Sequence, residues 1–176
     1  MKKNIIFLVF IFFLSCKSID SQIVSQGNID NAIMNSIIDF KKTKLFKTGA
    51  VFSVLENNEE EFYKITIISK GKNKYLYSKQ KKAKENKLPS RYYETDNKLF
   101  IWWDENHEVT DKNIEILNKY DMLVDDEGGN VWFLESSIDD SKKGATYFIC
   151  KNDLENYKRV ISSTSSSTLP NLKCNK

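Results

Sequence analysis

The chain contains a single histidine, His107, which lies among polar side chains capable of acid–base or metal chemistry. Its neighbours include Asp104, Glu105 and Glu108. A histidine can serve as the general base of a serine nucleophile, but no serine stands in a recognisable nucleophile motif. Zinc takes three or four ligands, so a zinc site would need partners from distant parts of the chain. We therefore interpret His107 as a solvated loop residue, and we predict no catalytic residue and no metal site.

Oxygen-bearing side chains alternate along the same segment, as they do in calcium-binding loops. The positions concerned are Asp104, Asn106, Glu108 and Asp111. The glycine that allows the sharp turn of such a loop and the glutamate at its twelfth position are both missing. The ordinary interpretation is a polar loop that caps the next helix. Motifs for binding phosphates, dinucleotides or a catalytic zinc do not occur, nor does the GxSxG motif of hydrolases, so we predict no cofactor.

The first sixteen residues indicate where the protein is sent. Lys2 and Lys3 precede an unbroken apolar run over residues 5–14. Such a run rises about 15 Å as a helix, about half of what a membrane-spanning helix needs, so it is typical of a secretory signal peptide. The run ends in Phe13-Leu14-Ser15-Cys16, which resembles the lipobox of bacterial lipoproteins.

This resemblance implies that the sulfur of Cys16 receives a diacylglycerol, that the peptide is cut after Ser15, and that the new amino group is acylated. Stable anchoring takes two hydrophobic signals, and a triacylated cysteine exceeds that requirement. In this family an aspartate after the cysteine favours the inner membrane, so Lys17 favours the outer membrane. The motif departs from the usual pattern at Phe13 and Leu14. Ordinary cleavage near residue 18 or 21, which would release a soluble protein, is the alternative.

Two further cysteines, Cys150 and Cys174, follow Cys16 in the chain. An exported protein meets oxidising conditions, in which an even number of cysteines indicates disulfide bonding. We therefore predict a disulfide between Cys150 and Cys174. In the chain-entropy model, closing a loop of about 25 residues stabilises a fold by about 3 kcal/mol. The alternative is one buried thiol and one exposed thiol in the tail.

The charges of the chain nearly balance. Loss of Lys2 and Lys3 with the signal peptide would leave 25 of the 27 basic residues against 24 acidic ones, and a nucleic-acid-binding domain would be strongly basic. We therefore predict no nucleic-acid partner. Eight lysines nevertheless lie between Lys70 and Arg91. They would meet anionic lipid headgroups or an acidic protein, or they form a solvated linker whose charges keep a sheet edge unpaired.

Aromatic residues on the predicted strands are the best candidates for ligand binding. Neighbours in a strand point to opposite faces, so Trp102 and Trp103 cannot share a face. We expect one face of the sheet to meet the N-terminal helix and the other to carry Phe100 and Trp102, together with Trp132. If that face is uncovered, it is a platform for a sugar, a peptide or a partner protein. The alternative is that these aromatic residues belong to the core.

Apolar periodicity predicts three helices. Residues 30–42 form a helix with one apolar face, capped by Asp30. A second, short helix follows Thr110, a suitable N-cap. A third follows Asn152, where Glu155 completes a capping-box-like start. Strands are predicted from alternating or continuous apolar runs at 51–55, 62–68, 74–78, 91–95, 98–103, 131–135 and 145–150.

This order of elements is α+β, with an antiparallel sheet of about six or seven strands and the N-terminal helix packed on it. Connections between neighbouring strands are too short for the parallel crossovers of a doubly wound fold. Nothing in the sequence indicates a second folded domain. We assign residues 1–15 to the signal peptide, 16–27 to the lipidated cysteine and its tether, 28–161 to the domain, and 162–176 to a Ser/Thr-rich tail.

We predict a non-enzymatic lipoprotein of the cell envelope, held in the outer membrane by its lipid anchor on either the periplasmic or the surface face. No oligomeric state is predicted. One alternative is a lipid-anchored immunity or inhibitor protein that blocks a toxin or a hydrolase, and another is a hydrolase. In the favoured interpretation the domain binds an envelope protein or a glycan.

Overall fold

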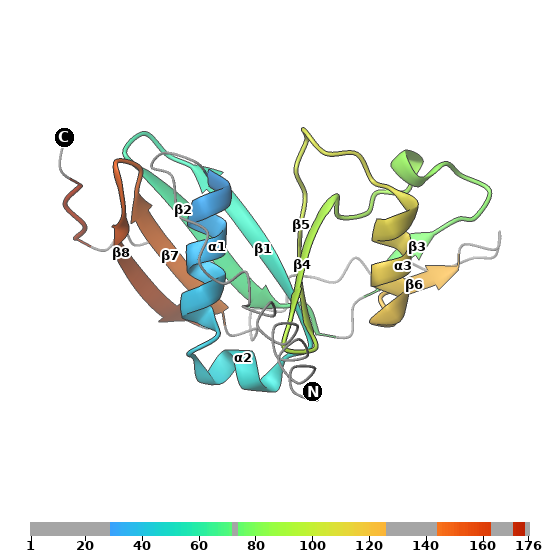
Figure 1. Ribbon diagram of the computed structural model, residues 1–176, viewed down its shortest axis with the longest axis horizontal. Helices are drawn as coiled ribbons and strands as arrows, with labels where there is room; N and C mark the ends of the chain where they lie inside the picture. Colours follow the sequence, from blue (N-terminus) through green and yellow to red (C-terminus); the bar gives the residue numbers. More distant parts are fainter. Residues whose placement is uncertain (1–28, 72–73, 126–143, 163–170, 175–176) are drawn as a thin grey trace, which may run out of the picture.

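Three β-hairpins lie side by side and form one six-stranded sheet in the computed structural model of the chain (Figure 1). The structure describes residues 29–71, 74–125, 144–162 and 171–174. The strand order is β4-β5-β1-β2-β7-β8, so the first hairpin of the chain occupies the middle of the sheet. The strands are β1 (Val51–Asn58), β2 (Phe62–Ser69), β4 (Arg91–Thr95), β5 (Lys98–Trp102), β7 (Gly144–Cys150) and β8 (Asp153–Ser162).

The helix α1 (Ile29–Phe40) covers one face of this sheet (Figure 1). Its apolar residues recur every three or four positions and therefore fall on one side of the helix, where Ile33, Ile37 and Phe40 are buried. They belong to the same core as inward-facing strand residues such as Phe52 of β1. The predicted α+β class, the single domain and the packing of the N-terminal helix on the sheet are confirmed.

A second, very short helix, α2 (Lys44–Thr48), follows α1 and lies across one end of the fold (Figure 1). Thr43 joins the two helices, because its Oγ1 donates to the carbonyl of Phe40 (2.7 Å) and accepts from the N–H of Phe46 (3.3 Å). The ring of Phe46 enters the core beneath α1. Leu45 also packs against this core, whereas Lys44 and Lys47 are exposed.

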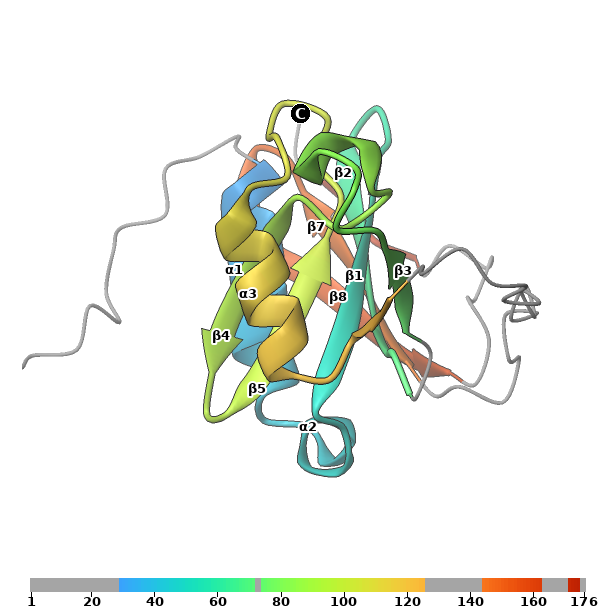
Figure 2. The ribbon, with the colours of Figure 1, turned by 90° about the vertical axis from the view of Figure 1, so that its right-hand side faces the viewer.

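A second layer covers the opposite face of β5 and β1, as Figure 2 shows. It consists of α3 (Asp111–Lys119) and of two short parallel strands, β3 (Tyr75–Tyr77) and β6 (Leu123–Asp125). The helix begins after Thr110 as predicted, and the N–H of Thr110 donates to Oδ1 of Asn113 (3.0 Å). The core between this layer and the sheet contains Val51, Leu88, Leu99, Ile101, Leu117 and Met122.

The sheet is mixed, whereas a wholly antiparallel sheet is predicted from the sequence. The strands β1 and β5 run parallel, with Val51 opposite Leu99. Parallel neighbours need a crossover of a dozen residues or more, and residues 59–97 provide it. Short connections join the strands of the three hairpins, which are antiparallel as predicted, and the distant strands β2 and β7 also pair antiparallel.

The third predicted helix, after Asn152, is wrong, because Asp153–Ser162 form the strand β8. It pairs antiparallel with β7, and Tyr157 lies opposite Ile149. The strand β7 is buried along its whole length, so its backbone groups need hydrogen-bond partners on both sides. β-branched and aromatic residues in the segment also favour a strand. The strand predicted at 131–135 lies outside the described residues.

The C-terminal segment lies against the last hairpin. The sulfur atoms of Cys150 and Cys174 are 1.96 Å apart and their Cα atoms 5.4 Å apart, which is the geometry of a disulfide. In addition, Nδ2 of Asn156 donates to the carbonyl of Lys173 (3.1 Å). The end of the chain is therefore held both to β7 and to β8, the edge strand of the sheet.

Replacement of Cys174 by serine is expected to lower the free energy of unfolding by about 3 kcal/mol, because the unfolded chain regains the entropy of an open loop. Urea unfolding without reductant measures this change. The matched control is the same comparison under reducing conditions, where the Cys174→Ser variant and the parent protein should have the same free energy of unfolding. Equal stability of the two proteins without reductant would show that the cysteines are not bonded.

Candidate functional site

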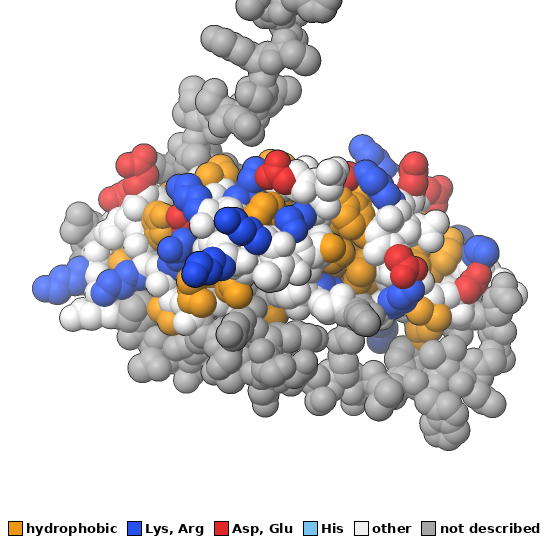
Figure 3. Space-filling view, turned by 90° about the horizontal axis from the view of Figure 1, so that it is seen from below, with side chains coloured by type: hydrophobic (Ala, Val, Ile, Leu, Met, Phe, Trp, Pro, Cys, Tyr) orange, Lys and Arg blue, Asp and Glu red, His pale blue; other side chains and the backbone are white. Residues whose placement is uncertain are grey.

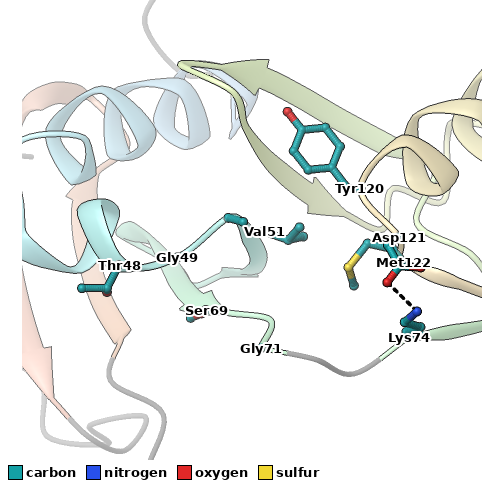
Figure 4. A pocket seen from close by; sticks show the side chains of 10 residues that line it. Thr48, Gly49, Val51, Ser69, Gly71, Lys74, Tyr120, Asp121 and Met122 are labelled. Atoms are coloured by element: carbon teal, nitrogen blue, oxygen red, sulfur yellow. Dashed lines mark ion pairs between the residues drawn. The ribbon is translucent and has the colours of Figure 1, made fainter.

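A pocket of about 430 Å³ lies between one end of the main sheet and the turn that follows α3 (Figure 4). Its volume is in the range of small-molecule sites. Separate segments of the chain line it: the link from α2 to β1, the end of β2, the residue before β3 and the turn after α3. The lining residues are Thr48, Gly49, Ala50, Val51, Ser69, Gly71, Lys74, Tyr120, Asp121 and Met122.

An ion pair stands at one end of this pocket, where Nζ of Lys74 lies 2.6 Å from Oδ2 of Asp121 (Figure 4). Asp121 has a positive φ of 53° and its N–H donates to the carbonyl of Asn118 (2.9 Å). This left-handed residue ends α3 and sends the chain back toward β3. The Asp121 side chain is 84% exposed, so the pair contributes little to stability and is accessible to a ligand.

Apolar and hydroxyl groups form the rest of the pocket. The side chains of Val51 and Met122 point toward each other in its middle (Figure 4), and both belong to the core under α3. Ser69 provides a hydroxyl at the end of β2 and Thr48 another at the end of α2. Oγ1 of Thr48 donates to the carbonyl of Leu45 (3.1 Å), which leaves its lone pairs to accept from a ligand.

Gly49 keeps the backbone close to the core at the wall of the pocket. A Cβ atom at this position would lie 2.5 Å from Cε1 of Phe52, well inside the distance of a normal contact. The carbonyl of Gly49 also accepts a hydrogen bond from Nζ of Lys98. The link between α2 and β1 is therefore fixed in position, and with it this wall.

Tyr120 lines the pocket with its ring, whereas its hydroxyl points away from the other labelled residues (Figure 4). The hydroxyl donates to Oε1 of Glu94 (2.8 Å). Burial raises the pKa of Tyr120, and the bond to the Glu94 carboxylate raises it further, to about 12. The phenol therefore stays protonated at neutral pH and does not act as a base on a ligand.

His107 lies in a separate polar cluster on the loop between β5 and α3. Its Nδ1 is 2.7 Å from Oδ2 of Asp104, which also lies 3.1 Å from a guanidinium nitrogen of Arg91. Burial opposes ionisation of Asp104, but the N–H of Asn106 and the contacts with His107 and Arg91 hold its pKa below the usual value. His107 does not line the pocket. These bonds fasten the loop to β4.

The predicted aromatic platform is wrong for Phe100 and Trp102, because both side chains face α1 and are buried. The ring of Phe100 stacks on that of Phe52, with centres 5.0 Å apart. Strand alternation turns Leu99 and Ile101 toward α3, the reverse of the expected assignment. The exposed tryptophan at this end is Trp103. Trp132 lies outside the described residues.

Acidic residues of the second layer neutralise part of the lysine-rich stretch 70–91. Lys74 pairs with Asp121 across the pocket, and Nζ of Lys79 lies 2.9 Å from Oδ2 of Asp125. These two pairs connect the segment before β4 to the turn and strand after α3. Both pairs are largely exposed, so they lower the charge of the stretch and contribute little to stability.

No residue of the pocket stands out in the sequence. Lys74 is one lysine among eight, and Asp121 follows a helix whose last residues carry no glycine to mark the left-handed turn. A polar residue directly after a predicted helix is a weak signal for such a turn. The residues come together through the pairing of strands that are distant in the chain.

Cys16, the predicted lipidation site, lies outside the described residues. None of the helices in the described ranges has the length and hydropathy that crossing a bilayer requires. Within the part of the chain that the structure describes, no three histidine, cysteine or acidic side chains gather in a way that would hold a metal ion. Comparison of the chain with protein-family models, with curated proteins and with solved structures finds no match.

Proposed function

We propose that the chain is a lipoprotein of the outer membrane, anchored through Cys16, and that its domain is a non-enzymatic module that binds a sugar unit of an envelope glycan. The observation that carries the proposal is the pocket with the Lys74–Asp121 pair at one end. The resemblance of residues 13–16 to a lipobox supports the anchor. The domain would then meet glycans at the membrane to which it is tied.

The chemistry of the pocket suits a neutral, hydroxylated ligand. Lys74 offers donors, the Asp121 carboxylate offers acceptors, and the hydroxyl of Ser69 offers both. The two charges cancel, so an ionic ligand would gain little from them. The partly exposed ring of Tyr120 provides an apolar surface for the C–H face of a sugar ring. A sugar matches the donors, the acceptors, the hydroxyl group and the apolar surface together.

The small number of carboxyl groups in the pocket favours binding of a glycan over its hydrolysis. Glycoside hydrolysis uses a pair of carboxyl groups on either side of the scissile bond. Among the described residues that line the pocket, Asp121 is the one carboxylate, and Lys74 is paired with it. The pocket therefore supports recognition of a sugar without the groups that would cleave it.

Titration of the protein with soluble oligosaccharides from peptidoglycan and from the outer membrane tests this proposal. Asp121→Asn is expected to raise the dissociation constant about tenfold, because a hydrogen bond to a charged group is lost. Isothermal calorimetry measures the change. The matched control is Asp125→Asn, which removes the same charge from a second-layer lysine pair outside the pocket. Failure of every oligosaccharide to bind would reject a glycan as the ligand. An equal loss of affinity in both variants would reject the pocket as the binding site.

A further inference from the structure

Five lysines gather at the end of the fold where α2 lies. This α2 face comprises Lys41, Lys42, Lys44, Lys47 and Lys98. Figure 3 looks at this end and shows several basic side chains close together at the position of α2. Asp96 lies among them and pairs with Lys41 (3.1 Å). The face as a whole is strongly positive.

Most of these lysines keep their charge unneutralised. Lys44 and Lys47 are exposed and form no ion pair with any residue that the structure describes. Nζ of Lys42 lies 3.8 Å from Asp39, whose other oxygen pairs with Arg159. Because Asp96 and Asp39 offset only part of this charge, the lysines repel one another, and the face gains free energy when an anionic surface approaches it.

We propose that the α2 face docks on the anionic lipid headgroups of the membrane in which the protein is anchored. This inference rests on the proposed lipid anchor. Basic residues near an anionic bilayer are each attracted to it, and the attraction falls off within a Debye length. The helix α2 lies flat across the end of the fold (Figure 1), so its lysines can reach one plane together.

The length of the chain before α1 permits this orientation. Residues 17–28 separate Cys16 from Ile29, and twelve residues reach about 40 Å when extended. The helix α1 has 12 residues and is therefore about 18 Å long. Ile29 begins α1 at the end opposite to α2 (Figure 1). The tether is more than long enough to let an anchor lie beneath α2.

A second group of lysines provides the comparison. Lys82 and Lys84 are exposed around the short 3-10 helix η1 (Ala83–Glu85). Figures 1 and 2 place this segment at the end of the fold opposite to α2. The two groups cannot rest on the same bilayer. Glu85 reduces the charge around η1, and the nearby Lys79 is paired with Asp125, so this group serves as the comparison for the α2 face.

The test uses unlipidated protein spanning residues 17–176, which contains every described element. Sedimentation with sucrose-loaded vesicles of phosphatidylcholine, with or without phosphatidylglycerol, measures binding at low and high salt. We expect binding to the anionic vesicles alone, weakened by salt. Lys44→Glu combined with Lys47→Glu should lower the partition coefficient by about tenfold or more. The matched variant, Lys82→Glu combined with Lys84→Glu, should change it by less than about twofold.

Equal binding to both kinds of vesicle would overturn the inference, as would equal losses in the two double variants. An acidic protein would then be the partner to seek for the α2 face. The outcome is independent of the anchor, because the protein tested carries no lipid. Failure of lipidation in cells would instead contradict the proposed function, so the two failures can be told apart.

Discussion

A Cys16→Ser substitution is expected to abolish the uptake of labelled palmitate. The resemblance to a lipobox makes the Cys16 sulfur the acceptor of the diacylglycerol, and a serine hydroxyl does not take its place. Acyl chains contribute about 0.8 kcal/mol for each buried CH₂ group, so three of them hold a protein firmly in a bilayer. Growth with labelled palmitate followed by gel electrophoresis measures the uptake, and fractionation shows that the labelled parent protein lies in the membrane pellet.

The control for this experiment is Cys174→Ser, which removes a sulfur that is distant from the lipobox in the sequence and is bonded to Cys150. That variant should incorporate as much palmitate as the parent protein. An unlabelled parent protein would contradict lipidation altogether. Label in the Cys16→Ser variant would place the modification on another residue.

Phe100→Ala is expected to lower the free energy of unfolding by about 3–5 kcal/mol, the usual cost of removing a buried phenylalanine ring. The Phe100 side chain is fully buried. Its ring centre lies 5.0 Å from that of Phe52, 6.1 Å from that of Phe40 and 6.2 Å from that of Phe46. The substitution would leave a cavity at the junction of α1, α2 and the sheet. Urea unfolding followed by circular dichroism measures the loss.

Trp103→Ala provides the comparison, since Trp103 directly follows β5 and 44% of it is exposed. Its removal should cost no more than about 1 kcal/mol, as is usual for surface positions. If Phe100→Ala left stability unchanged but reduced glycan binding, the original interpretation of Phe100 as part of a ligand platform would regain support over its assignment to the core.

The local pattern of the sequence predicted most elements of the fold. Strands over residues 51–55, 62–68 and 91–95 and the helix after Thr110 appear where expected, because their signals are local: alternation, apolar runs and a capping residue. The helix predicted after Asn152 failed for the opposite reason. Its apolar spacing fits a helix as well as a strand. The segment forms a strand because the buried strand β7 needs a hydrogen-bonded neighbour, and no local sequence pattern reveals that need.

The candidate site was much less predictable than the fold. Alternation correctly separates Trp102 from Trp103, but it does not say which of the two faces α1. That choice depends on the position of β5 beside β1, a parallel pairing between distant segments. The pocket depends on the same long-range contacts, since Ser69 and Asp121 line one pocket only after the second layer has closed over the sheet.

The order of the hairpins in the sheet has a consequence for the newly made chain. The first hairpin, β1–β2, becomes the centre of the sheet, and its two outer edges are later covered by β5 and β7. Until those strands have been synthesised, both rows of edge amides and carbonyls are open to foreign strands. The chain is therefore most prone to aggregate after residue 69 has been synthesised and before residue 150 has, because β7 then covers the open edge of β2.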